Sequence, residues 1–225
     1  MHVEGRIDPG VSRWLWIIKW LLFIPHAVVL VLLWIASGVR TVVAGIAVLF
    51  SGRYPRPIFD FSDGVLRWSW RVAFYAIGAF GMDRYPPFSL AADPNYPADL
   101  SIEYPEHLSR GLVLVKWWLL ALPRYLIVGV FAGGWGLGGD VMTRAVGSYG
   151  LIGILVLIAG VMLAACGRYP AGIFDFVMGM NRWCVRVFAY VTLMRDEYPP
   201  FRLDLGGQEP GGRRPAASSP PMPPT

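Results

Sequence analysis

Two sets of polar residues with identical spacing stand 115 residues apart in the chain. In each set an aspartate is followed at offsets of 4, 7, 11 and 15 residues by a glycine, two arginines and a tyrosine. Since an α-helix turns about 100° per residue, these offsets place the five side chains within roughly 80° of one another. Each set predicts one polar stripe on one helix: Asp60, Gly64, Arg67, Arg71 and Tyr75 in the first, and Asp175, Gly179, Arg182, Arg186 and Tyr190 in the second.

The two arginines of each stripe need an anion, because like charges four residues apart on a helix repel one another. One candidate is the other stripe, which pairs Asp60 with Arg182 or Arg186 and Asp175 with Arg67 or Arg71. A second is a lipid phosphate, which arginine binds through two parallel hydrogen bonds. A third is a substrate or an ion pathway. We favour the first interpretation, in which the stripe joins two parts of the protein, over lipid binding, and lipid binding over a pathway.

Residues for catalysis are scarce. Asp60 and Asp175 resemble a pair of catalytic carboxylates, but arginines on the same helical face favour their ionised form over a proton donor. The three histidines lack metal-ligand spacing, and Cys166 and Cys184 are better explained as buried thiols than as a zinc or redox site. No nucleophile elbow or nucleotide-binding loop is present. We therefore expect a non-enzymatic protein with no catalytic residue, metal or cofactor.

The composition indicates a membrane protein. Hydrophobic residues make up 55% of the 225-residue chain and charged residues 16%, and the mean hydropathy is +0.48. The apolar residues come in long blocks, and about 20 of them are needed to cross a bilayer. We predict four spanning helices, two of them short, at residues 14–36, 37–51, 112–132 and 151–166. Lys19 and Lys116 lie near the ends of their blocks, where their ammonium groups are expected to reach the interface.

One charge lies near the middle of a predicted span. Arg124 follows Pro123, which removes a backbone donor and frees the carbonyl of Leu119. Ionisable residues inside a membrane are candidates for function. We favour structural packing at the proline kink, because the guanidinium can satisfy the freed carbonyl.

An internal repeat organises the chain. Gly52-Arg53-Tyr54-Pro55 returns as Gly167-Arg168-Tyr169-Pro170, and Tyr85-Pro86-Pro87-Phe88 returns as Tyr198-Pro199-Pro200-Phe201. Each repeat is expected to contain a transmembrane helical hairpin, a turn that carries the Arg-Tyr-Pro motif, and an amphipathic helix at the cytoplasmic interface. The expected domains are residues 1–97, residues 98–205 and a disordered Pro/Gly-rich tail at residues 206–225.

Charge determines the expected topology. A stripe arginine at the bilayer centre costs about 2.5–3.5 kcal/mol, which an interfacial helix avoids. With two spans per repeat, both termini, both Arg-Tyr-Pro turns and residues 82–108 share one side, and among 20 Lys and Arg residues only Arg40 and Arg144 lie in loops on the other. This asymmetry is typical of a cytoplasmic face. A repeat with three spans is the alternative.

The polar segments add a small sheet to this all-α integral membrane fold. "HVEGRI", "FSLAA", "ADLSIEY" and "FRLDL" show partial alternation of apolar and polar residues. We expect some of them to pair as strands beneath the helices.

The paired motifs also carry a resemblance. The stretches "GRYPRPIFDF" and "GRYPAGIFDFVMGMNRWCVRVFAYVTLMRDEYPPF" resemble a bacterial integral-membrane family, common in actinobacteria, that is catalogued as domain of unknown function four-three-eight-nine. The resemblance extends to about Leu205. It implies a location in the bacterial inner (plasma) membrane, and it implies no established activity or catalytic residue.

The functional expectation is an accessory or scaffold component of the cell envelope that acts through anionic lipid headgroups or membrane-protein partners. The alternatives are a small transporter or channel subunit with Arg124 as its pathway residue, and after that a lipid-modifying enzyme. The net charge of +5 is accounted for by the cytoplasmic interface, so no nucleic acid partner is expected.

Overall fold

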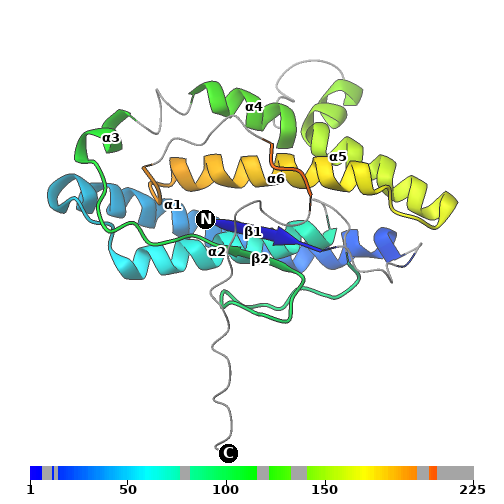
Figure 1. Cartoon of the computed structure of the whole chain (residues 1–225), viewed down its shortest axis with the longest axis horizontal. Helices are drawn as coiled ribbons and strands as arrows, with labels where there is room; N and C mark the ends of the chain where they lie inside the picture. Colours follow the sequence, from blue (N-terminus) through cyan, green and yellow to red (C-terminus); the bar gives the residue numbers. More distant parts are fainter. Residues whose placement is uncertain are drawn as a thin grey trace, which may run out of the picture.

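The computed structural model describes residues 1–6, 12, 15–76, 82–115, 122–132, 141–196 and 203–206. These residues are mostly helical and include one two-stranded sheet. The elements are β1 (His2–Gly5), α1 (Leu15–Ser51), α2 (Arg56–Ala76), β2 (Ala98–Ser101), α3 (Arg110–Val115), α4 (Leu122–Ala132), α5 (Val141–Cys166) and α6 (Ala171–Val191) (Figure 1).

Helix α1 is one continuous helix of 37 residues where two spanning helices, 14–36 and 37–51, were predicted. That prediction is wrong, because Ser37 and Gly38 do not break the helix. The carbonyl of Ser37 accepts a hydrogen bond from Thr41 Oγ1 at 2.9 Å, and Pro25 also lies within the helix. The first half of the chain therefore has no helical hairpin between residues 15 and 51.

The second half is built differently. Helices α4 and α5 are separate elements in contact with each other, and α5 also packs against α6. Within α5 the backbone departs from helical geometry at Gly150, where φ is 60° and ψ is 179°. A glycine adopts this backbone conformation without steric cost, so the chain bends there before the apolar helix Gly150–Cys166.

One helix in the described part of the chain is long and apolar enough to cross a membrane. It is the Leu21–Ser51 part of α1. The Gly150–Cys166 helix is apolar but shorter. Length and composition thus give weak support to a membrane location.

Equivalent turns lead into α2 and α6. Gly52 and Gly167 have φ values of 72° and 68°, which favour glycine. The amide of Gly52 donates to the carbonyl of Val48 at 2.7 Å, and that of Gly167 donates to Leu163 at 2.9 Å. These turns end α1 and α5 in the left-handed conformation common at helix C-termini. The chain then reverses, so that α2 packs against α1 and α6 packs against α5.

The sheet joins the two halves of the chain. Strands β1 and β2 pair antiparallel, with Val3 opposite Leu100. The repeat also includes the pair Ser12-Arg13, which returns as Ser109-Arg110 after 97 residues, and Leu100 follows Val3 by the same separation. The strands therefore meet at equivalent positions of the repeat. Figure 1 shows the sheet in front of the space between α2 and α6.

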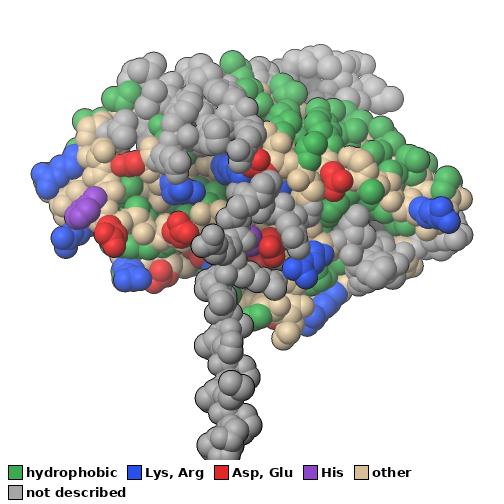
Figure 2. All heavy atoms as spheres, in the orientation of Figure 1, with side chains coloured by type: hydrophobic (Ala, Val, Ile, Leu, Met, Phe, Trp, Pro, Cys, Tyr) green, Lys and Arg blue, Asp and Glu red, His purple; other side chains and the backbone are tan. Residues whose placement is uncertain are grey.

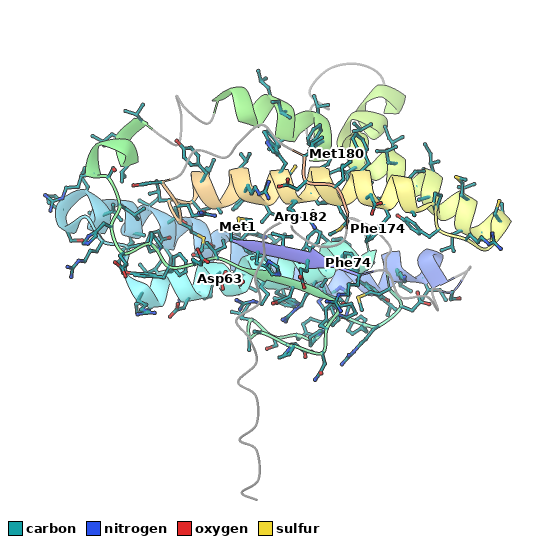
Figure 3. The ribbon with its side chains drawn as sticks, in the orientation of Figure 1. Met1, Asp63, Phe74, Phe174, Met180 and Arg182 are labelled. Carbon is teal, nitrogen blue, oxygen red and sulfur yellow. The ribbon has the colours of Figure 1, made fainter. Side chains whose placement is uncertain are left out.

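The hydrophobic core also draws on both halves. One buried cluster contains Val3 and Phe74 from the first half and Leu100 and Phe174 from the second. The ring centroids of Phe74 and Phe174 are 6.2 Å apart, and Figure 3 labels Phe74 near the end of strand β1 and Phe174 closer to α6. The strands predicted from "HVEGRI" and "ADLSIEY" are present, whereas residues 88–92 of "FSLAA" and the described residues 203–205 of "FRLDL" form no strand.

Candidate functional site

The first stripe faces the sheet and the segment that follows the first Tyr-Pro-Pro-Phe motif. Arg67 Nε donates to the carbonyl of Leu100 at 2.8 Å, and its Nη1 donates to the carbonyl of Leu90 at 3.1 Å. Its Nη2 pairs with Asp63, one turn earlier on α2. Asp63 in turn accepts the amide of Ile102 at 3.0 Å. Arg67 thus ties α2 to β2 and to the exit segment, which we define as residues 89–91 in the first half and 203–206 in the second.

Arg71 lies one turn beyond Arg67 and is fully buried. Its Nη1 donates to the carbonyl of Ala91 at 2.9 Å, and its Nη2 is 3.7 Å from Asp99 Oδ1. Burial lowers the pKa of the Arg71 guanidinium, and Asp99 opposes that shift. Burial likewise raises the pKa of the Asp63 carboxyl, against the attraction of Arg67. The first stripe therefore holds a compensated set of charges in a partly dehydrated region.

Arg182, the counterpart of Arg67, is fully buried and donates to three backbone carbonyls. Its Nε reaches Val3 at 3.1 Å in β1, while Nη1 and Nη2 reach Asp204 at 2.5 Å and Gly206 at 2.8 Å. Arg186 Nη2 pairs with the Asp204 carboxylate at 2.6 Å. Figure 3 shows Arg182 extending from α6 toward β1. Both stripes are thus covered by a strand and by an exit segment.

The arginine contacts cross between the halves. Arg67 of the first half bonds to β2, which opens the second half, and Arg182 of the second half bonds to β1 at the N-terminus. Their acceptors, Leu100 and Val3, are directly opposite each other in the sheet. We call these two contacts the cross-half clasp. Each places a cation against the strand of the other half and satisfies a backbone carbonyl there, with Arg182 fully buried and Arg67 partly buried.

The aspartates of the two stripes lie elsewhere. Asp60 is exposed near the start of α2, and Asp175 is partly exposed, with its backbone carbonyl accepting the amide of Gly206 at 3.3 Å. Within the described part of the chain, the stripe arginines pair with the carboxylates of Asp63, Asp99 and Asp204, in place of the predicted Asp60 and Asp175. Asp60 shares the face of Arg67 but lies too far along the helix axis to face the sheet.

The remaining predicted residues divide into buried and exposed groups. Tyr75 and Tyr190 are buried, and the buried Tyr54 donates its hydroxyl to the carbonyl of Thr192 at 3.5 Å. Burial raises the pKa of the Tyr169 hydroxyl. The turn arginines Arg53 and Arg168 are exposed. The backbone of Arg124 belongs to α4, and its side chain lies outside the described residues, as does all of Lys116.

Lys19 corrects a second prediction. Its side chain is fully buried, and Nζ donates to the carbonyl of Met82 at 2.7 Å and pairs with Asp83 Oδ1 at 2.8 Å. It does not extend to the interface, because a carboxylate and a carbonyl of the chain itself take up its charge. Asp83 also accepts the amide of Ser12 at 2.5 Å, and Asp196 accepts that of the repeat partner Ser109 at 2.6 Å.

Sequence reasoning missed the acidic partners Asp63, Asp83, Asp99 and Asp204. One of them could have been found, since Asp63 and Arg67 stand four residues apart on a helix. The others are far from their partners along the chain. Within the described residues no group of three or more His, Cys, Asp or Glu side chains could hold a metal ion. Chemically, the arrangement is a set of buried cations bonded to backbone carbonyls and carboxylates.

The fold and these contacts describe a mostly helical protein with one candidate membrane helix and a repeated arginine-to-strand contact. The family described as "Domain of unknown function (DUF4389)" matches the chain at residues 13–89 and 142–202, one segment in each half and together more than half of the chain. The chain belongs to this family, as its Arg-Tyr-Pro and Tyr-Pro-Pro-Phe motifs indicated. Searches of curated proteins and of solved structures found no match.

Proposed function

We propose that this protein is a non-enzymatic scaffold or accessory component of the bacterial inner membrane, with its N- and C-termini in the cytoplasm. The observation that carries the proposal is the contrast between helix α1 and the helices α2 and α6. The apolar outer side of α1 is exposed, whereas the charged stripes of α2 and α6 face inward. A soluble protein rarely leaves so long an apolar surface uncovered.

The exposed side of α1 is continuous. Leu21, Val28, Ile35 and Val42 follow one another at intervals of seven residues and are 68%, 59%, 62% and 65% exposed. Hydrophobic side chains also gather over α5, whereas acidic and basic side chains spread over the face that carries the sheet (Figure 2). These surfaces suit a protein with an apolar side in lipid and a charged side in water. The multi-pass part of the proposal is the second half, where segments 112–132 and 151–166 form the crossing hairpin.

The polar contacts support the proposed position of the termini. Strand β1 pairs with β2, and the exit segment at 203–206 bonds to Arg182 beside β1. One side of the protein therefore carries the N-terminal strand β1, the strand β2 and the described C-terminal residues 203–206. The distribution of basic residues supports our proposal that this side is the cytoplasmic one.

The proposed contact with anionic lipid involves the turn arginines and not the stripes. The stripe arginines bond to groups of the chain itself. The turn arginines Arg53 and Arg168 have exposed guanidinium groups, and so do the nearby Arg56 and Arg110, which we include with them from here on. Exposed basic residues next to apolar helices are suited to phosphate headgroups.

Native mass spectrometry in mild detergent tests this proposal with two matched variants, each with four Arg→Gln changes. The stripe variant changes Arg67, Arg71, Arg182 and Arg186, and the turn variant changes Arg53, Arg56, Arg110 and Arg168. We expect anionic lipid or a membrane-protein partner to copurify with the wild type and to be lost from a stable turn variant, while the stripe variant loses thermal stability. A protein that is released from membranes by alkaline carbonate, or that carries neither lipid nor protein, contradicts the proposal.

A further inference from the structure

Both ends of α1 are fastened to the same polar segment, residues 82–108. At the start of the helix, Lys19 bonds to Met82 and Asp83. Just past its end, the carbonyl of Gly52 accepts the amide of Leu108 at 3.0 Å. The segment also contacts the interior of the helix, where the rings of His26 and Phe88 are stacked with centroids 4.1 Å apart. The helix and the segment therefore lie on the same side of the molecule over the length of α1.

This segment belongs in water or among headgroups. Its exposed polar residues include Arg84, Asn95, Glu103, Glu106 and His107. Each charged side chain placed at the bilayer centre costs about 2.5–3.5 kcal/mol. Its two ends cannot lie at opposite faces of a bilayer without the segment itself crossing the hydrocarbon. Since the two ends of α1 are fastened to it, they also lie at one face.

The length of the apolar surface agrees with this placement. Exposed apolar side chains run from Ile18 to Phe50, which corresponds to about 48 Å of helix at 1.5 Å per residue. The hydrocarbon core of a bilayer is about 30 Å thick. A helix that crossed along the membrane normal would leave more than a third of this surface in water, and burying all of it would need a tilt beyond the usual range of about 0–40°.

Arg40 gives an independent indication. Its side chain is exposed, and its guanidinium lies 3.8 Å from the ring centroid of Phe61 on α2. In a crossing helix Arg40 would be about 16 Å from Ser51, near the middle of the hydrocarbon. Around the helix it lies roughly 100–160° from the line of Leu21, Val28, Ile35 and Val42. A helix lying flat with that line in the lipid places Arg40 at the headgroup level instead.

We propose that α1 lies within the cytoplasmic leaflet, parallel to the membrane plane, with the acyl chains of that leaflet covering its exposed apolar side. This inference rests on the proposed membrane location and changes the role of α1 from a span to an in-plane anchor. The helix then resembles an interfacial amphipathic helix whose polar side is covered by the protein itself.

Spin-label depth measurements test the orientation. A Cys166→Ser background removes the exposed thiol, whereas burial raises the pKa of Cys184 to about 12 and keeps it unreactive. Single cysteines at Leu21, Val28, Ile35 and Val42 carry the label in vesicles of phosphatidylethanolamine and phosphatidylglycerol. Glu106→Cys, in the polar segment, is the water-exposed control.

Oxygen and a water-soluble nickel chelate report the depth of each label. An in-plane helix gives four similar depths below the headgroups. In a crossing helix these positions span about 31 Å of depth, with the middle labels deepest. That profile would overturn the in-plane orientation but not the proposed membrane location. If all four labels are as accessible to nickel as Glu106→Cys, α1 is outside the lipid, and the proposed membrane contact of this helix fails as well.

Sidedness gives a second readout with a matched pair, Ser12→Cys just before α1 and Ser51→Cys at its last residue. A membrane-impermeant maleimide should label both in inside-out vesicles and neither in intact spheroplasts. Labelling of the two positions from opposite sides of the membrane contradicts an in-plane α1.

Discussion

The two halves of the chain keep the same arginine-to-strand contact but compensate its charge differently. In the first half Arg67 has a carboxylate on its own helix, Asp63. The equivalent position in the second half is the buried Met178, and the carboxylate there is Asp204 of the exit segment, which pairs with Arg186 and stands where the first half has Ala91. The source of the negative charge has moved from helix to exit segment. What both halves retain is the bond from a stripe arginine to a carbonyl of the opposite strand.

This comparison makes Arg182 the most sensitive of the stripe residues. Arg182→Met leaves three backbone carbonyls without their donor, and we expect it to lower the free energy of unfolding by about 3–5 kcal/mol. Arg67→Met loses two such bonds, and Asp63 can take up a proton once its partner is gone, so its effect should be smaller. Thermal unfolding in detergent measures both. Equal melting temperatures for Arg182→Met and the wild type would show that the second half of the clasp contributes no stability.

The glycines of the stripes are expected to differ in the opposite direction, with the first half more sensitive, for a packing reason. A Cβ added at Gly64 would lie 2.9 Å from Cβ and 3.1 Å from the carbonyl oxygen of Leu90, both rigidly attached to the backbone. At Gly179 the nearest atom, at 3.0 Å, is the flexible end of the Leu205 side chain. We expect Gly64→Ala to cost about 1–3 kcal/mol and Gly179→Ala less than about 1 kcal/mol. The reverse order in a chemical denaturation series would contradict this account of how the exit segments pack.

The third prediction concerns pH and the first half alone. Burial raises the pKa of Asp63 above the usual value of 3.8, so the folded protein holds this proton more tightly than the unfolded chain does. The associated stability is present below pH 3.8 and is lost as pH rises through the folded-state pKa. Asp63→Asn should therefore gain stability relative to the wild type as pH increases over that window. Parallel unfolding curves for the two proteins across this range would show that the pKa of Asp63 is not raised.

Much of this local structure was predictable from short-range patterns. The helices α2 and α6 begin just after the Arg-Tyr-Pro turns, as the stripes require, and β1 and β2 arise from two of the alternating segments. The single helix α1 does not follow from the lengths of the apolar blocks, which predict separate spans at 14–36 and 37–51, whereas Ser37 and Thr41 bond within one helix.

The partners of the arginines were beyond sequence reasoning for a different reason. Their main acceptors are backbone carbonyls of Leu100, Leu90 and Val3, and every residue carries a carbonyl. Only the tertiary fold decides which of them face a guanidinium. Asp60 was predicted as a partner from its angle around α2, but the sheet covers a different stretch of that helix.

The pairing of Val3 with Leu100 is the geometric centre of the cross-half clasp, and a disulfide tests it directly. In a Cys166→Ser background, Val3→Cys and Leu100→Cys place two thiols at directly opposite positions of an antiparallel pair, where Cβ atoms are about 4.5–5.5 Å apart. Val3→Cys with Ser101→Cys is the matched control, because the register is shifted by one residue and the side chains point to opposite faces.

The account predicts that the Val3–Leu100 cysteine pair forms an intramolecular disulfide on mild oxidation in native membranes and that the melting temperature rises, while the control pair stays reduced. Failure of the Val3–Leu100 pair to crosslink in a protein that is otherwise folded, or equal crosslinking of both pairs, would contradict the claim that the two halves are joined about this pair of strands.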